Sequence, residues 1–345
     1  MKLPATHYMY ILFLLLLFIQ SDDVKANNQS IDRFIIGVNA HILTKDDAEV
    51  ERMIDSMSSL NFQMARIDVP WDVIEKQKGK YIIPAKWDFV INKLKSKNIE
   101  PLLILDYGNP LYNNGDKPTT EASRLAFANY AKYTAKHFNK VRYFQIWNEW
   151  DAGSAGTSEG TVNDYKLLVK KTYPAIKEVS PDSVVLTGAF SAAGFDRKFK
   201  IGTGDFYEKY ITEDMSMYTD GLAVHPYTTY RPHPYNEYWF YLEQLKYLMI
   251  MVREVNGFMN KPVYVTEIGW STSITRDSIS EDFQSEYISN AICDAKKLGV
   301  AGVLLYDIKD DYADRHKTSS GFGLYDYRWR AKKAVHSLSK LKCDE

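Results

Sequence analysis

Short apolar segments recur along the chain and alternate with longer segments in which apolar residues return at helical spacing. Near-continuous apolar runs are typical of strands buried on both faces, whereas a return every three to four residues is typical of amphipathic helices. Eight segments predict strands: 34–42, 64–71, 100–108, 142–150, 183–190, 221–227, 261–270 and 302–310. The clearest helical segments are 46–60, 121–138 and 281–299.

Strands that alternate with helices eight times predict parallel strands joined by crossover helices. We therefore expect the α/β fold class and a single (β/α)8 TIM barrel. The alternative is a doubly wound open sheet, but no Gly-x-Gly-x-x-Gly motif follows the first predicted strand. No Pro-, Ser- or Gly-rich linker divides the chain, so one catalytic domain is expected over residues 27–345.

The first 26 residues are predicted to be a targeting segment rather than part of the fold. The apolar run at 8–19 is shorter than the roughly 20 residues that a helix needs to span a bilayer. Val24 and Ala26 occupy the small-residue positions before a cleavage site, so 1–26 reads as a signal peptide. We expect an exported protein, periplasmic or secreted, without stable membrane insertion after cleavage; an uncleaved anchor is the alternative.

The charge and cysteine content of the chain indicate which kinds of partner and cofactor to expect. The chain has 43 Lys and Arg against 44 Asp and Glu, so bulk charge gives no support for a nucleic-acid partner. No cysteine or histidine spacing typical of a zinc site is present, and we expect no metal and no cofactor. In an exported chain, Cys293 and Cys343 either form one disulfide or stay as two separate thiols.

Polar residues follow the predicted strands at the end of the barrel where this architecture places its chemistry. Charged groups in such positions cost free energy unless they are paired or used, so a ring of them indicates a site. The ring consists of His41, Arg66, Asp68, Asp106, Tyr107, Asn148, Glu149, His225, Tyr227, Glu267, Tyr306 and Asp307.

Two glutamates of this ring predict cleavage of a glycosidic bond. Glu149 lies in WNEW and Glu267 in VTEIGW, three strand-and-helix repeats later, so both should project from one rim. Cleavage needs one carboxyl group that protonates the leaving oxygen and one carboxylate that acts at the anomeric carbon. Arg66 is the candidate cation that keeps one of them ionised, although both could instead be structural partners of Arg66. A retaining enzyme predicts a carboxyl separation of about 5–5.5 Å, and an inverting one about 6.5–9.5 Å.

With Asn148 directly before Glu149, and Glu267 three repeats later, the chain resembles the retaining glycoside hydrolases of clan A. The segments GVNAH and ARIDVPWDVIE make it most similar to glycoside hydrolase family 39, including its bacterial exopolysaccharide-degrading members, with family 5 the nearest competitor. The resemblance implies that Glu149 is the acid/base, that Glu267 is the nucleophile and that Asn148 binds the sugar 2-hydroxyl.

The resemblance also implies further binding residues. Arg66 would lie near the nucleophile, and Tyr227 of the His225-Pro226-Tyr227 element would donate a hydrogen bond to it. We also expect contacts to the substrate from Trp150, Trp270, His41 and Tyr306. Core packing is the alternative for the histidines and the tryptophans. The chain departs from many clan members in having Tyr306 in place of Trp and Trp150 in place of Pro.

Together these features predict a monomeric retaining endo-glycosidase that acts by double displacement on a β-linked polysaccharide or oligosaccharide. An exopolysaccharide substrate follows only by analogy with the family. The aromatic residues of 227–241 favour a polymer-binding groove, unless they form the buried face of a helix. The alternatives are an exo-acting, xylosidase-like β-glycosidase and a non-catalytic polysaccharide-binding barrel; the presence of both glutamates and Arg66 argues against the latter.

Overall fold

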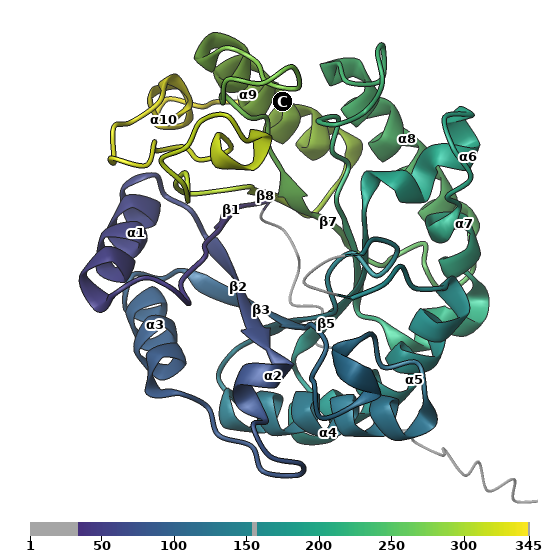
Figure 1. Cartoon of the computed structure of the whole chain (residues 1–345). Coiled ribbons are helices and arrows are strands. Elements are labelled where there is room, and N and C mark those ends of the chain that lie inside the picture. Colours follow the sequence, from purple (N-terminus) through teal and green to yellow (C-terminus); the bar gives the residue numbers. More distant parts are fainter. Residues whose placement is uncertain (1–33, 154–156, 344–345) are drawn as a thin grey trace, which may run out of the picture. The chain divides into compact units, whose positions relative to one another are not determined.

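The computed structural model describes residues 34–153 and 157–343, so the predicted signal peptide at 1–26 lies outside the described part. Eight parallel strands close into a barrel in which each strand pairs with the next and β8 pairs with β1 (Figure 1). The strands are β1 Ile35–Asn39, β2 Met64–Pro70, β3 Glu100–Asp106, β4 Tyr143–Ile146, β5 Val184–Phe190, β6 Gly221–Val224, β7 Val263–Ile268 and β8 Gly302–Leu305. The predicted fold class, a single TIM barrel, is confirmed.

Helices surround the barrel on its outer side (Figure 1). They are α1 Asp47–Ser59, α2 Trp71–Ile74, α3 Ala85–Ser96, α4 Glu121–His137, α5 Val162–Val179, α6 Asp196–Phe199, α7 Phe206–Tyr210, α8 Tyr238–Glu254, α9 Glu281–Leu298 and α10 Lys333–Leu338. Short 3₁₀ turns lie at Asn113–Gly115, Ala192–Phe195, Glu213–Tyr218 and Thr318–Ser320. Asp46, Thr120 and Ser280 begin α1, α4 and α9 by accepting a hydrogen bond from the amide three residues later.

All eight predicted strands are present, but several end earlier than predicted. β4 ends at Ile146 rather than at residue 150. The reason is that Trp147 and Glu149 adopt left-handed backbone angles, with φ of 67° and 45°, which a strand cannot contain. Glu149 therefore lies on the turn after β4 and not on the strand itself.

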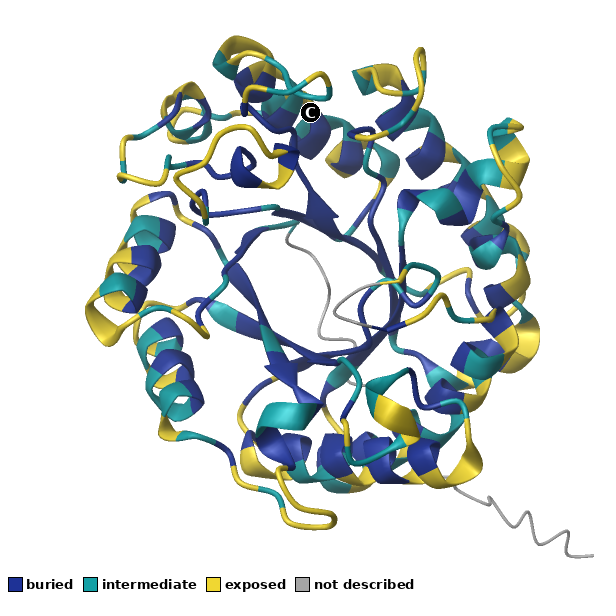
Figure 2. Cartoon of the chain, viewed as in Figure 1, coloured by how far each residue is buried: buried dark blue, intermediate teal, exposed yellow. Residues whose placement is uncertain are grey.

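The barrel interior is apolar toward the strand N-termini and polar toward their C-termini. Side chains two positions apart share a face of a strand, so Met64 precedes Arg66, and Ala223 precedes His225, on the inner face. The buried inner cluster comprises Met64, Leu102, Ile104, Tyr143, Leu186, Ala189, Ala223, Tyr264 and Leu304. Figure 2 shows the strands buried along nearly their whole length. The apolar packing at the N-terminal ends of the strands therefore lies beneath the polar residues at their C-terminal ends.

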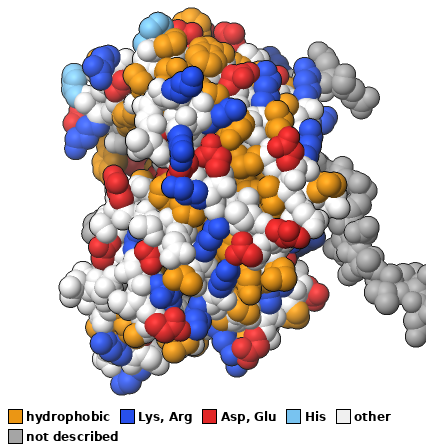
Figure 3. All heavy atoms as spheres, turned by 90° about the vertical axis from the view of Figure 1, so that its right-hand side faces the viewer, with side chains coloured by type: hydrophobic (Ala, Val, Ile, Leu, Met, Phe, Trp, Pro, Cys, Tyr) orange, Lys and Arg blue, Asp and Glu red, His pale blue; other side chains and the backbone are white. Residues whose placement is uncertain are grey.

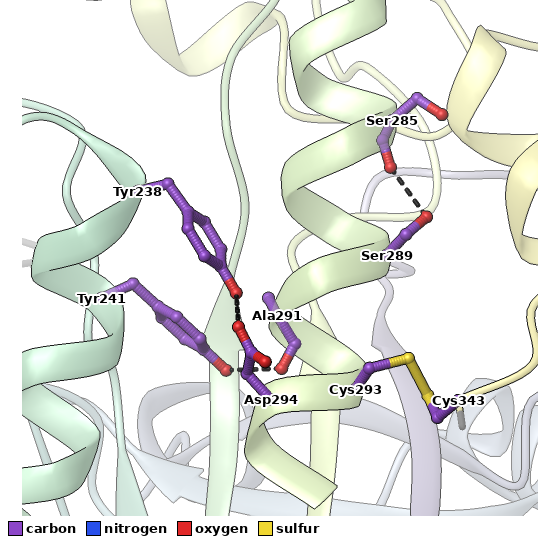
Figure 4. The surroundings of a disulfide bond; sticks show 8 residues. All are labelled: Tyr238, Tyr241, Ser285, Ser289, Ala291, Cys293, Asp294 and Cys343. Atoms are coloured by element: carbon purple, nitrogen blue, oxygen red, sulfur yellow. Dashed lines mark hydrogen bonds between the residues drawn. A yellow bond between two sulfur atoms is a disulfide. The ribbon is translucent and has the colours of Figure 1, made fainter. Parts of the chain in front are cut away.

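The C-terminal region is fastened to α9. Cys293 of α9 and Cys343, which follows α10, form a disulfide (Figure 4). On another side of α9, Tyr238 donates to Asp294 at 2.6 Å and Tyr241 donates to the carbonyl of Ala291 at 3.0 Å. The pairing that the sequence left open is therefore made in the structure.

The outer surface carries mixed charge. On the side of the molecule that bears α6 and α7, basic and acidic side chains are interspersed (Figure 3). Within residues 34–153 and 157–343, no helix combines the length and apolar character needed to cross a membrane.

Candidate active site

Glu267 of β7 is buried at the C-terminal end of the barrel among polar partners. Arg66 Nη1 lies 2.7 Å from Glu267 Oε1, and the Tyr227 hydroxyl donates to Oε2 at 3.1 Å. Burial alone would raise the pKa of this carboxyl group, but the electrostatic effects of His225 and Arg66 and the Tyr227 hydrogen bond outweigh it. The pKa of Glu267 is therefore held below its ordinary value, and the carboxylate is ionised at neutral pH.

Arg66 is held in place by two asparagines. Its Nη1 donates to Asn39 Oδ1 at 2.8 Å and its Nη2 donates to Asn148 Oδ1 at 2.6 Å. Asn39 in turn donates to the carbonyls of Thr266 and Leu305. The guanidinium is thus tied to four strands or their ends, and its position relative to Glu267 is fixed.

His225 lies between the two glutamates. Its fully buried ring has Nδ1 3.0 Å from Glu149 Oε1, and Nε2 2.9 Å from Thr266 Oγ1 and 3.7 Å from Glu267 Oε1. One carboxylate oxygen of Glu149 lies within 4.8 Å of one of Glu267. An approach this close between two carboxylate oxygens is compatible with the roughly 5–5.5 Å between the carboxyl groups of retaining glycosidases.

The two carboxylates differ in access to solvent. The side chain of Glu149 is 22% exposed, whereas that of Glu267 is 9% exposed and ion-paired. A group that exchanges protons with a leaving group and with water must reach the open side of the site, whereas a nucleophile must be charged and fixed. The asymmetry matches these two roles.

The backbone aims both glutamates into the barrel mouth. Left-handed angles at non-glycine residues cost on the order of 1–3 kcal/mol each, so the turn after β4 needs local support. The side-chain amide of Gln145 donates to the carbonyl of Trp147 at 2.8 Å, and the Glu149 backbone amide donates to the carbonyl of Ala189 at 2.9 Å. Glu267 falls where the pairing of β7 with β8 shifts register, an irregularity that can redirect a side chain.

A buried lysine fastens the loop that follows Glu149. Lys117 Nζ donates to the carbonyl of Ala152 and to Thr157 Oγ1, each at 2.9 Å, and also to the carbonyl of Ser158. Burial lowers the pKa of Lys117 to about 8, against the nearby carboxylates. The β3–α4 and β4–α5 loops are therefore joined beside the site.

Within the described ranges 34–153 and 157–343, two clusters of three side chains have the spacing of metal ligands, namely Glu149, His225 and Glu267, and His41, Asp307 and Asp311. In the first cluster Arg66 already compensates the charge of Glu267. In the second, Lys45 Nζ lies 3.0 Å from Asp311 Oδ1. In each cluster, one carboxylate is therefore compensated by a protein cation.

His41 and Tyr306 line the side of the mouth formed by β1 and β8. His41 Nδ1 bonds to Asp311, and its ring meets the Tyr306 ring edge-on at 5.4 Å. Burial disfavours the imidazolium, but the Asp311 hydrogen bond and the charges of Asp307 and Asp311 raise the pKa of His41 to about 9. Tyr306 also meets the Tyr227 ring at 6.3 Å, so these rings connect to the Glu267 site.

The predicted sugar contacts of Trp150 and Trp270 are corrected by the structure. Both side chains are buried, at 0% and 2% exposure, and present no face to a sugar. Their indole N–H groups are used inside the fold, Trp150 donating to the carbonyl of Thr161 and Trp270 to Thr228 Oγ1. Each residue follows a glutamate closely in sequence but turns toward the helices.

The aromatic residues of segment 227–241 also differ in whether they are buried in the fold or reach the site. Phe240 and Tyr241 are fully buried, and Tyr238 packs on Trp270 with ring centres 6.0 Å apart. Three rings therefore pack on the inner side of α8, whereas Tyr230 and Trp239 stay exposed, and Tyr227 reaches a carboxylate of the described site.

Sequence reasoning brought together the main residues and missed several that support them. Arg66, Asn148, Glu149, His225, Tyr227 and Glu267 meet at one point, as expected. The missed residues are Asn39, Thr266, Asp311 and Lys117. Asn39 could have been predicted, because it is a polar residue at the end of a predicted strand. Lys117 could not, because it lies in a loop where no sequence pattern marks it.

A closed parallel barrel with two neighbouring carboxylates after β4 and on β7 matches the arrangement found in retaining glycoside hydrolases. Residues 24–301 match the model of the cellulase family, glycosyl hydrolase family 5. The chain therefore belongs to this family. No curated protein sequence matches the chain.

Solved structures with a similar fold include a family 39 enzyme and two other glycosidases. A family 39 glycoside hydrolase from the gut symbiont Bacteroides cellulosilyticus WH2 has a TM-score of 0.74 and 25% identity, covering 90% of this chain and 64% of that one. The exo-β-1,4-mannosidase Op5Man5 from Opitutaceae bacterium strain TAV5 has a TM-score of 0.68 and 18% identity, covering 89% and 59%. A monomeric β-xylosidase from Caulobacter crescentus CB15 has a TM-score of 0.67 and 18% identity, covering 89% and 67%.

The chain thus spans less than two thirds of the length of the first two of these structures. The expected membership of clan A, with families 39 and 5 as the two candidates, is confirmed. The sequence model assigns family 5, and family 39 returns as a structural neighbour.

Proposed function

We propose that the chain hydrolyses a β-glycosidic bond with retention, using Glu267 as nucleophile and Glu149 as acid/base. The observation that carries this proposal is the different setting of two neighbouring carboxylates. Glu267 is buried, ion-paired to Arg66 at 2.7 Å and held ionised, whereas Glu149, within 4.8 Å, is the more exposed. Separate settings for two carboxyl groups are what assign acid and nucleophile roles.

The reaction proceeds in two displacements. In the first, a carboxylate oxygen of Glu267 bonds to the anomeric carbon while the bond to the leaving oxygen breaks and Glu149 donates its proton to that oxygen. In the second, Glu149 takes a proton from water, the water oxygen bonds to the anomeric carbon and the bond to Glu267 breaks. Asn148, which is held by Arg66, is placed to bind the hydroxyl next to the reacting carbon.

The substrate that we propose is a β-linked polysaccharide, cleaved within the chain, and an exopolysaccharide by analogy with bacterial family 39 members. Two hollows of about 340 and 600 Å³, which share Thr44, Lys45 and Asp311 of the loops after β1 and β8, support internal cleavage because they offer room for more than one sugar. We also propose an exported monomer that carries its signal peptide at 1–26. Exo action is the second candidate, because the similar structures include an exo-β-1,4-mannosidase and a β-xylosidase.

A panel of bacterial exopolysaccharides and plant β-glycans, with sized products, tests the proposal. We expect oligosaccharides from at least one polymer with the wild type and none with Glu267→Gln. Monosaccharides alone would replace the endo assignment by the exo one. Absence of products from every polymer, with unchanged polymer binding by Glu267→Gln, would overturn the hydrolase assignment in favour of a binding barrel.

A further inference from the structure

Lys117 is a buried lysine in the loop between β3 and α4. Only 1% of it is exposed, and its three donor bonds go to oxygens of Ala152, Thr157 and Ser158 in the loop between β4 and α5. An ammonium group has three N–H donors and no acceptor, so these three oxygens satisfy it. Within the ranges 34–153 and 157–343, Lys117 forms no ion pair. Its buried charge is therefore bound chiefly by the loop that follows Glu149.

The bond to Ala152 connects Lys117 with the backbone of Glu149. The amide of Ala152 donates to the carbonyl of Glu149 at 3.0 Å, which closes a tight turn over residues 149–152. Glu149 begins this turn with a left-handed φ of 45°, a conformation that a non-glycine residue keeps only where its surroundings hold it. Lys117 adds such support, because it binds the far end of the turn from another loop.

Lys117 also contacts the two tryptophans that flank Glu149. Its Nζ lies over both rings, 5.8 Å from the centre of Trp147 and 5.6 Å from the centre of Trp150. At these distances the face of an indole ring attracts a cation. The two rings meet edge-on, with centres 5.0 Å apart. The same ammonium group therefore holds side chains on both sides of Glu149 along the chain.

The loop that carries Lys117 is itself fastened. Asp116 accepts from the backbone amide of Lys117 at 2.7 Å, and from the amide and the hydroxyl of Ser158 at 2.8 and 2.6 Å. The side-chain amide of Asn113 donates to the carbonyl of Lys117 at 2.6 Å. The ammonium group is therefore a fixed point from which the turn after β4 is held.

The position of Glu149 matters because its carboxyl group must reach the leaving oxygen. Proton transfer needs the two oxygens within hydrogen-bond reach, and a displacement of about 1 Å can cost about 100-fold in rate. Glu267, by contrast, is held by Arg66 and Tyr227. Loss of Lys117 should therefore impair the proton transfers of Glu149 and spare the attack by Glu267.

We propose that Lys117 is a positioning residue for the acid/base: by holding the turn after β4, it places the Glu149 carboxyl group where it can protonate the leaving oxygen. This inference rests on the proposed function of Glu149 and Glu267. Lys117 is buried and does not itself reach the substrate.

The test compares two leaving groups on one sugar. 2,4-Dinitrophenolate is a stable anion that departs without a proton, whereas a phenyl glycoside needs a proton from Glu149. Both aryl β-glycosides are made with glucose, xylose, mannose and any oligosaccharide that the wild type releases from a polymer. For Lys117→Met we expect kcat/KM to fall about tenfold or more on the phenyl glycoside and to stay within about threefold on the dinitrophenyl glycoside.

The second displacement gives an independent readout. It needs Glu149 as base, so Lys117→Met should show a lower kcat together with a lower KM on the dinitrophenyl glycoside, because the glycosyl-enzyme accumulates. Azide attacks without giving up a proton and should restore kcat. A loss of folding stability alone would produce neither effect.

Two further variants serve as controls. Lys117→Arg keeps the charge and several donors, so it should recover part of the activity on the phenyl glycoside and guards against misfolding of the methionine variant. The matched control is Lys332→Met, because Lys332 is also buried but bonds to Asp310 and to the carbonyl of Gly321, beyond β8. Lys332→Met should leave the ratio of the two kcat/KM values as in the wild type.

An equal fall for Lys117→Met on both leaving groups, or no fall, would overturn the positioning role. The proposed function would then still stand if Glu149→Gln loses kcat/KM on the phenyl glycoside and keeps it on the dinitrophenyl glycoside. Glu149→Gln without this difference, or a wild type that cleaves neither polymers nor aryl glycosides, would overturn the proposed function, and this inference with it.

Discussion

Arg66 and Glu267 form the ion pair around which the other side chains of the site are placed. Both are buried, and removing one partner of a buried pair leaves an uncompensated charge that costs about 3–5 kcal/mol. The ion pair between Arg66 and Glu267 is therefore not evidence that the protein gains stability from it. Its effect is to fix the charged carboxylate of Glu267 at a defined position. Tyr227 completes this arrangement from the segment after β6, because its hydroxyl is a donor that favours the ionised form of Glu267.

Replacing Tyr227 by phenylalanine should move the acid limb of the kcat/KM profile to higher pH. The wild-type limb is expected below about 4.3, the ordinary value for a glutamate, because the pKa of Glu267 is lowered. A hydrogen bond to a charged group contributes about 1.5–3 kcal/mol, and one pKa unit corresponds to about 1.4 kcal/mol, so the expected shift is about 1–2 units. Tyr112→Phe, which removes a tyrosine bonded to Glu75 away from the site, is the control. An unmoved limb in Tyr227→Phe would contradict the role of Tyr227.

Residues at strand ends were predictable from the sequence, whereas the direction of side chains beyond the strands was not. Arg66, His225 and Glu267 follow apolar runs at positions that a barrel brings together. Trp150 and Trp270 lie as close to the glutamates in sequence, yet both turn outward into the core between barrel and helices. Local backbone angles decide this direction, and no periodic pattern encodes them.

At the scale of elements, the loops after β1 and β8 are joined by charge. His41 and Lys45, which follow β1, both contact Asp311, which follows β8. The raised pKa of His41 means that the folded protein holds this proton more tightly than the unfolded chain. Burial also raises the pKa of Asp307 to about 8, although the charge of His41 opposes this rise. The contribution of Asp307 to stability therefore also falls as the pH rises.

The stabilising effect of His41 should therefore be complete below pH 6.5 and be lost as the pH rises toward about 9. We expect the difference in Tm between the wild type and His41→Gln to be largest near pH 6 and to shrink steadily up to pH 9. Thermal unfolding followed by circular dichroism measures it. The control is His137→Gln, which removes a surface histidine that contacts Asp88. A difference that is constant with pH would show that His41 does not carry its proton in the folded state.

The elements themselves were largely predictable, but the limits of the strands were not. Alternating apolar runs and helical periods identified all eight strands and the helices α1, α4 and α9. The early end of β4 depends on left-handed angles at Trp147 and Glu149, which bonds to Gln145 and Ala189 hold in place. The bond from Glu149 to Ala189 connects the turn after β4 with β5, so it does not follow from the local sequence.

At the scale of the whole molecule, the closed barrel and the disulfide determine how the ends of the described domain are held. The barrel closes when β1 pairs with β8, so both termini of the strand series meet at one seam. The disulfide between Cys293 and Cys343 fastens the segment after α10 to α9. In the chain, α9 directly precedes β8, one of the two strands that close the barrel. The sequence alone could not predict this disulfide, because a disulfide requires two cysteines close together in space and their distance depends on the fold.

Loss of the disulfide should lower stability without abolishing activity. The bond joins residues 50 positions apart, and closing a loop of that length restricts the unfolded chain by about 4 kcal/mol at most, with 2–4 kcal/mol typical. We expect a fall in Tm of about 5 °C for the double variant Cys293→Ser, Cys343→Ser. Reductant should lower the Tm of the wild type similarly and leave the variant unchanged. A wild type insensitive to reductant would contradict a contribution of this bond to stability.

The most direct test of the central claim is covalent trapping of the nucleophile. The protein is incubated with 2,4-dinitrophenyl 2-deoxy-2-fluoro-β-glycosides of glucose and xylose, digested and analysed by mass spectrometry. The account predicts a stable glycosyl group on the peptide that contains Glu267, no label in Glu267→Gln, and loss of activity in step with labelling. A label on Glu149 or on another residue, or polymer cleavage that persists without any label on Glu267, would contradict it.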